Sequence, residues 1–172
     1  YFLLREMPFG NDGAFSRNAL LRRYNAALAN DLGNLVSRVV EMVDKFLGGV
    51  LPKKPSLDKD FFAQEVAKKT ALVEERMEAL DFSGALGVIW GVISQLNVRI
   101  NEQAPWKVAK TDPERVKVIL FDLVWSIRIA TGWIEPFMPQ TAAKIQAQLG
   151  VRQFGEGAGL AHPLGHAGDD WV

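Results

Sequence analysis

The sequence lacks cysteine altogether and holds only two histidines among its 172 residues. Without cysteine, neither a disulfide framework nor a thiolate metal site can form. His162 and His166 both lie in a glycine-rich stretch near the C-terminal end, which excludes histidine-based metal or acid–base chemistry in the body of the chain. We therefore expect no metal and no cofactor to be bound by this chain. The missing cysteines also fit a reducing, cytoplasmic setting.

The chain also lacks an excess of charge of either sign, because its 20 Lys and Arg residues balance its 20 Asp and Glu residues. A neutral chain cannot hold nucleic acid by bulk electrostatic attraction, so any such site would have to be local and base-directed. No uncharged apolar run is long enough for a membrane span. The most apolar stretch, residues 116–134, carries Lys117, Asp122 and Arg128, and it therefore predicts a buried helix.

No segment shows the alternating pattern of a strand, and no phosphate loop, dinucleotide fingerprint or nucleophile–base pair is present. The periodicity instead predicts an all-α fold, an antiparallel-type bundle of four long helices with shorter additional ones. We expect a linker over residues 1–15, a helical domain over 16–149 and a glycine-rich tail over 150–172.

Capping residues divide the predicted domain into helices. Ser16 predicts the start of a first helix that runs to about Ala29, and Asn30 or Asp31 the start of a second. Asp112, followed by proline, predicts the start of a long apolar helix. The second predicted helix ends at Leu47, a third runs from Asp58 or Lys59 to Leu80, and a fourth from Asp81 to about Ile100. The long apolar helix is broken by Pro136 and Pro139, and a short helix follows to about Leu149. Within the span 81–100, Gly84, Gly87 and Gly91 share one side, which either admits a close neighbour or reflects chance.

Two polar side chains on the second predicted helix are candidates for reading nucleic-acid bases. Asn34 and Arg38 lie one turn apart on the side opposite the apolar stripe. An asparagine offers a donor and an acceptor, and an arginine offers a rigid fork of donors. The alternative is an ordinary solvated face on which Arg38 pairs with Glu41.

Trp106 is a third candidate, because it follows Pro105 at the expected end of a helix. The proline should stop the helix and push Ala104 towards an extended conformation. Trp106 would then either cover the end of the bundle or leave its ring free to stack on an unpaired base. Trp90, Trp125 and Trp133 lie within helical patterns and are predicted to be core residues.

Three stretches of the chain resemble the methionyl-tRNA synthetase family. They are residues 1–16, which contain YFLLREMPFG, residues 24–38, YNAALANDLGNLVSR, and residues 101–107, NEQAPWK. The resemblance runs to about Leu149. It departs at Ala14, where an acidic residue is typical. The start at Tyr1 is expected to lie soon after the family's K-M-S-K-S loop, so the chain resembles a fragment of a longer enzyme.

The resemblance implies a helical anticodon-binding domain whose partner is the anticodon loop of methionine tRNA. Asn34, Arg38 and Trp106 match the family's anticodon-binding residues by local context. The family charges tRNA with methionine using ATP, but neither its H-I-G-H nor its K-M-S-K-S signature occurs here. We therefore expect this chain alone to be inactive and the missing catalytic domain to be a second partner. The alternatives are the corresponding domain of another class I synthetase and a helical protein-interaction module.

Overall fold

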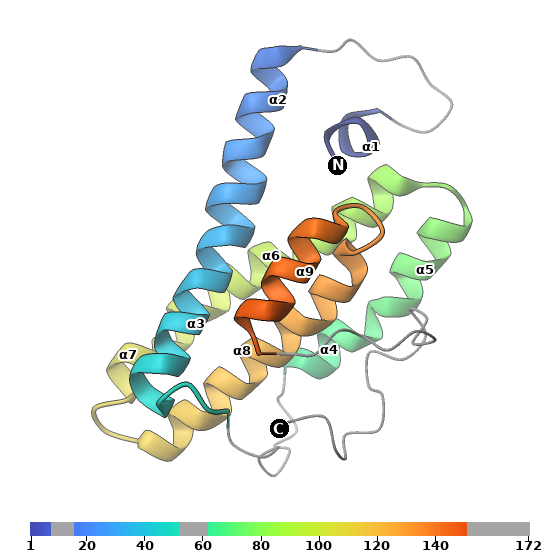
Figure 1. Ribbon diagram of the computed structural model, residues 1–172. Coiled ribbons are helices and arrows are strands. Elements are labelled where there is room, and N and C mark those ends of the chain that lie inside the picture. The colour runs from blue at the N-terminus through green and yellow to red at the C-terminus, as the bar shows by residue number, and fades with distance from the viewer. Residues whose placement is uncertain (8–15, 52–61, 151–172) are drawn as a thin grey trace.

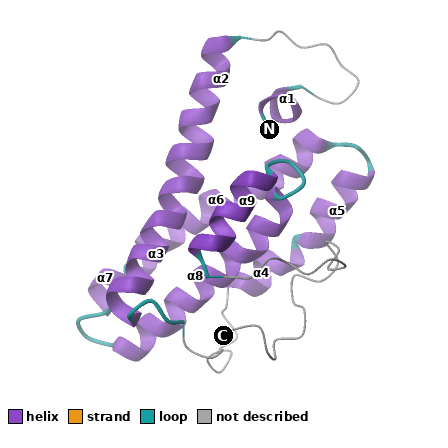
Figure 2. Cartoon of the chain, viewed as in Figure 1, coloured by secondary structure: helices purple, strands orange, loops and turns teal. Residues whose placement is uncertain are grey.

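The computed structural model describes residues 1–7, 16–51 and 62–150, and every regular element within these ranges is a helix (Figures 1 and 2). The predicted all-α class is confirmed. The elements are α1 (Phe2–Glu6), α2 (Arg17–Arg23), the π-helical η1 (Tyr24–Gly33), α3 (Asn34–Leu47), α4 (Phe62–Lys68), α5 (Thr70–Glu78), α6 (Phe82–Gln103), α7 (Pro105–Val108), α8 (Pro113–Ile134) and α9 (Pro139–Gln148). The tail from residue 151 onward lies outside the described residues.

The helix α8 forms the centre of the bundle. Fifteen of its 22 residues are buried, and it packs against α3, α4, α6, α7 and α9. Asp112 accepts a hydrogen bond from the backbone N–H of Arg115, at 2.9 Å, as its position before a proline predicts. Trp125 and Trp133 are buried along α8, and Trp90 is buried on α6, which confirms all three as core residues.

The first two predicted helices are in fact one continuous rod. The predicted break at Asn30 or Asp31 is wrong, because α2, η1 and α3 follow one another without an interruption from Arg17 to Leu47 (Figure 1). Across the predicted boundary the chain keeps a helical path by widening to i→i+5 hydrogen bonding over η1. At the far end of the rod, Gly48 adopts the left-handed conformation at φ 64° and ends the helix where the glycine pair predicts.

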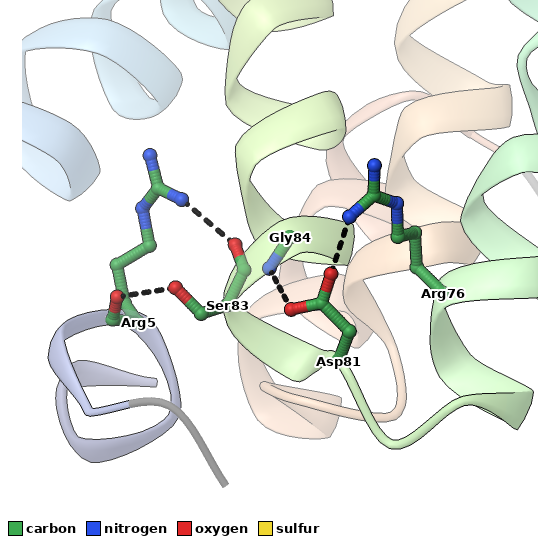
Figure 3. Close-up of polar contacts among 5 residues, drawn as sticks. All are labelled: Arg5, Arg76, Asp81, Ser83 and Gly84. Atoms are coloured by element: carbon green, nitrogen blue, oxygen red, sulfur yellow. Dashed lines mark hydrogen bonds and ion pairs between the residues drawn. The ribbon is translucent and has the colours of Figure 1, made fainter.

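The segment expected as a linker includes a short helix, α1, that docks on the N-terminal half of α6. Figure 3 shows two reciprocal hydrogen bonds: Arg5 donates to the carbonyl oxygen of Ser83 at 2.9 Å, and Ser83 donates its hydroxyl to the carbonyl oxygen of Arg5 at 3.0 Å. A Cβ added at Gly87 would meet the Arg5 guanidinium at 3.2 Å, so this glycine does admit a close neighbour. Nothing lies within 4 Å of the same position at Gly91. The same position at Gly84 meets only the side chain of Asp81, which caps the same helix, so of the three glycines Gly87 alone admits a neighbouring helix.

The third predicted helix is divided. The structure has α4 and α5 in its place, with a break at Lys69, and residues 52–61 lie outside the described part of the chain. A side chain of another helix caps the start of α4. The buried carboxylate of Asp122 on α8 accepts hydrogen bonds from the backbone N–H groups of Phe62, at 3.2 Å, and Ala63, at 2.8 Å. No local sequence signal carries this contact, because its partners lie about 60 residues apart.

Candidate functional site

Asn34 and Arg38 project from the first turns of α3. Asn34 is the first residue of that helix and is exposed, and Arg38 is half-buried one turn further on. The opposite side of α3 holds Leu35, Val36 and Val39, all buried in the core. The apolar stripe therefore turns the polar pair towards the surface, as its spacing predicts.

The Arg38 guanidinium contacts two residues: Asn101, near the C-terminal end of α6, and Trp106, at the start of α7. It donates a hydrogen bond from Nη2 to Oδ1 of Asn101 at 2.9 Å. Its Cζ also lies 5.8 Å from the centroid of the Trp106 ring, within the range of a cation–π contact. The structure thus brings two of the three predicted site residues, Arg38 and Trp106, into direct contact. Asn34 is placed one turn away on the same helix.

Trp106 is exposed, with 38% of its surface accessible. The reason is the turn between α6 and α7, in which Ala104 is left-handed at φ 40° and ψ 58° and Pro105 is buried. The expectation of an extended Ala104 is therefore wrong. The left-handed residue reverses the chain tightly enough for Pro105 to become the first residue of α7. Pro105 is buried at this turn, whereas Trp106 keeps part of its surface accessible.

The electrostatic setting of Arg38 is unusual for a half-buried arginine. Among the described residues no carboxylate forms an ion pair with it, so the alternative pairing with Glu41 does not occur. Its hydrogen-bonding partner is a neutral amide, which accepts one of the five guanidinium N–H donors. The arginine therefore keeps its positive charge and several donors available beside a partly accessible aromatic ring. Such an arrangement suits a flat, hydrogen-bonding, negatively charged ligand such as an unstacked nucleotide.

Asn101 is a site residue that the sequence reasoning did not single out. It lies in the quoted stretch NEQAPWK, five residues before Trp106. Because α6 ends at Gln103, Asn101 lies on the last turn of that helix, close to the turn between α6 and α7. That position could have identified it as a neighbour of Trp106, but its contact with Arg38 crosses 63 residues of sequence.

Two other kinds of site are absent from the described ranges. No group of three or more His, Asp or Glu side chains there could hold a metal ion. No helix in the same ranges is long and apolar enough to cross a membrane.

Comparison with protein-family models defines the class. Residues 53–158 match the anticodon binding domain of methionyl tRNA ligase, and residues 1–40 match the class I tRNA synthetases of the methionine type. The chain thus has the fold of the anticodon-binding domain of a class I aminoacyl-tRNA synthetase. The second match ends inside α3, so Asn34 and Arg38 lie in the segment shared with the synthetase model, whereas Trp106 lies in the anticodon-binding model.

The chain belongs to the methionyl-tRNA synthetase family. It is 47% identical over 160 residues to the methionine–tRNA ligase of Caldanaerobacter subterraneus subsp. tengcongensis, covering 89% of this chain. It is 40% identical over 157 residues to the Bacillus subtilis enzyme, covering 88% of this chain. It spans about a quarter of the length of these curated relatives, 25% and 24% respectively.

Solved structures agree with the sequence comparisons. The apo form of Mycobacterium tuberculosis methionyl-tRNA synthetase superposes with a TM-score of 0.78 at 36% identity, covering 85% of this chain and 31% of that one. The same enzyme in complex with methionyl-adenylate gives a TM-score of 0.79 at 36% identity, with 84% and 30% covered. The methionine family is therefore assigned over the other class I synthetases and over a helical protein-interaction module.

Proposed function

We propose that this chain recognises the C-A-U anticodon of methionine tRNA, with Trp106 stacking on the first anticodon base and Asn34 and Arg38 hydrogen-bonding to base edges. The observation that carries the proposal is the contact of Arg38 with a neutral amide and an exposed indole ring in place of a carboxylate. A charge left unneutralised at the surface, next to an aromatic face, is available to an anionic and aromatic ligand.

Recognition of this kind needs an RNA loop whose bases can leave their stack. Single-stranded loops offer both base faces and Watson–Crick edges, and proteins read RNA sequence mostly there. The overall neutrality of the chain supports a local mode of binding, since no excess of basic residues is available to follow a phosphate backbone.

The test is a titration of this chain with a short RNA hairpin that carries the C-A-U loop, and with a second hairpin whose first anticodon base is replaced. We expect stronger binding to the first hairpin, and a loss of roughly 5- to 160-fold on Trp106→Ala, corresponding to ~1–3 kcal/mol for one stacked base. Trp133→Phe, a change at a buried tryptophan of α8, is the matched control. Equal binding of both hairpins would contradict base recognition.

We further propose that the enzyme to which this domain belongs joins methionine to tRNA with ATP, in the cytoplasm, and that the catalytic domain is a partner of this segment. The chain has neither catalytic signature of the family, so by itself it is expected to be inactive. Incubation of the chain with ATP, methionine and tRNA tests this expectation, and formation of aminoacylated tRNA would contradict it.

A further inference from the structure

The π-helical segment η1 ends directly before the first proposed anticodon-binding residue. It covers Tyr24–Gly33, and α3 begins at Asn34. Helices with i→i+5 bonding are rare and frequently mark functional sites. Where i→i+5 bonding gives way to i→i+4 bonding, the spacing shortens by one residue, so one carbonyl receives no amide from its own helix. The position of that change also sets the direction in which every later side chain points.

A side chain of α6 donates to a carbonyl oxygen close to this change. Asn97 donates from Nδ2 to the carbonyl oxygen of Asp31 at 3.1 Å and to that of Ile93, in its own helix, at 3.1 Å. An amide NH₂ has two hydrogens, and these two bonds use both. The bond to Ile93 fixes the side chain on α6, and the bond to Asp31 holds the rod two residues before η1 ends.

The contacts between α6 and the rod run in the same order along both helices. The indole N–H of Trp90 donates to the carbonyl oxygen of Ala27 at 3.4 Å, Asn97 donates to Asp31, and Asn101 accepts from Arg38. The steps of seven and four residues on α6 keep these three side chains on one face. One face of α6 therefore both fastens η1 and orients the arginine that follows it.

We propose that Asn97 is a positioning residue of the anticodon-binding site: by holding the Asp31 carbonyl it determines where the π-helix ends, and so the rotation at which α3 presents Asn34 and Arg38. This role rests on the proposed function of that pair. Asn97 is half-buried and lies one turn before Asn101, so it acts through α3 and does not need to touch RNA itself.

The test compares Asn97→Leu, which keeps the size of the side chain but removes the donor, with the wild-type chain. Two quantities are measured: amide hydrogen exchange over residues 31–38 without RNA, and the ratio of affinities for the C-A-U hairpin and for hairpins with a replaced base. We expect faster exchange and a ratio that falls about fivefold, the effect of one misplaced hydrogen bond. Asn97→Gln, which keeps an amide donor, should retain more of the ratio. A purely structural role would lower the affinities for all hairpins equally.

The matched control is Gln95→Leu on the same helix. Gln95 also uses an amide, but its contact is with Lys69 at 3.0 Å on an exposed side of α6, so neither quantity should change. If Asn97→Leu melts far below the wild type, Asn97→Ser, whose hydroxyl is too short to reach Asp31, replaces it. An unchanged ratio despite faster exchange, or an equal loss for all hairpins, would overturn the positioning role. Wild-type binding without any base preference would instead overturn the proposed function and this role with it, while the exchange data still show whether Asn97 holds the segment.

Discussion

Two arginines of this bundle make the same two kinds of contact, one with a polar oxygen and one with an aromatic ring, but their partners differ. Arg99 on α6 lies 3.4 Å from the carboxylate of Asp122 and 5.1 Å from the centroid of the Phe62 ring. Arg38 on α3 bonds to the amide of Asn101 and lies beside the Trp106 ring. Both arginines combine a polar oxygen with an aromatic face, yet the oxygen is charged in the first cluster and neutral in the second.

The difference in charge separates a structural cluster from a binding cluster. The Asp122 carboxylate is buried and also bonds to the start of α4, so the Arg99 cluster joins α4, α6 and α8 and leaves little for a ligand. The Arg38 cluster joins only α3 to the α6–α7 junction and retains its positive charge at the surface. An arginine with a neutral partner is therefore the better indicator of a ligand site than an arginine in an ion pair.

The largest effect is expected from removing the buried carboxylate. Asp122→Ala leaves two backbone N–H groups and the Arg99 guanidinium without their acceptor, and should lower the free energy of unfolding by about 3 kcal/mol. Urea denaturation, monitored by circular dichroism, measures this loss in the free energy of unfolding. Asp112→Ala, which removes an exposed helix cap, should cost only about 1 kcal/mol. Equal losses for the two variants would mean that the buried cluster does not join the helices as described.

The binding cluster should respond in affinity and not in stability. Arg38→Lys keeps the charge but loses the planar fork, so binding of the C-A-U hairpin should weaken about tenfold while urea stability changes by less than about 0.5 kcal/mol. Fluorescence titration and denaturation of the same samples test both halves of the prediction. A tenfold loss that is the same for a hairpin with replaced bases would assign Arg38 to a phosphate instead of a base.

A smaller loss of affinity is expected from replacing Asn101, the neutral hydrogen-bonding partner of Arg38. Asn101→Ala removes the acceptor that orients Arg38 without touching its charge, so affinity for the C-A-U hairpin should fall about fivefold. The dependence of binding on salt should stay unchanged, because no cationic group is lost. A change in the salt dependence would show that Asn101 acts on the charge of the site and not on its geometry.

The smallest effect is a contrast in pH dependence between two carboxylates. Burial, the largest cause, raises the pKa of Asp122 above 3.8 despite its bonds to Ala63 and Arg99. The hydrogen bond from Arg76, followed by that from the Gly84 N–H, lowers the pKa of Asp81 below 3.8 (Figure 3). The two groups should therefore contribute to the pH dependence of stability with opposite signs.

The sign follows from proton binding in the two states. Folded Asp122 binds a proton more readily than in the unfolded chain, so its contribution to stability falls as the pH rises from 3.8 through its raised pKa. Folded Asp81 binds a proton less readily, so its contribution is present above 3.8 and is lost as the pH falls through its lowered pKa. Asp122→Asn should thus steepen the gain in stability with rising pH, and Asp81→Asn should flatten it. Urea titrations at a series of acidic pH values measure the slope for each variant and for the wild type. Changes in slope of the same sign for the two variants would contradict the assigned causes.

Much of the fold could be predicted from the sequence because its signals act within one helical turn. The cap at Asp112 and the stop at Gly48 depend on residues three or four positions away, and both are confirmed. The outward direction of Asn34 and Arg38 follows from the apolar stripe of their own helix. The predicted break at Asn30 or Asp31 fails where distant residues contact the chain: η1 continues the rod and accepts hydrogen bonds from Trp90 and Asn97 of α6. The short helix α1 within the expected linker likewise bonds to a distant residue, Ser83.

By itself, then, the sequence determined the helical class, the central place of α8, the core tryptophans and the polar pair on α3, because periodicity and capping are local properties of a chain. Only the tertiary structure decided that Asp122 starts α4, that Asn97 fastens η1 and that Asn101 holds Arg38 beside an exposed Trp106. The partners in these contacts lie about 60 residues or more apart, from 59 between Ala63 and Asp122 to 66 between Asn97 and Asp31. Packing of the helices brings them within hydrogen-bonding distance, and no periodicity along one helix encodes which side chain of another will face it.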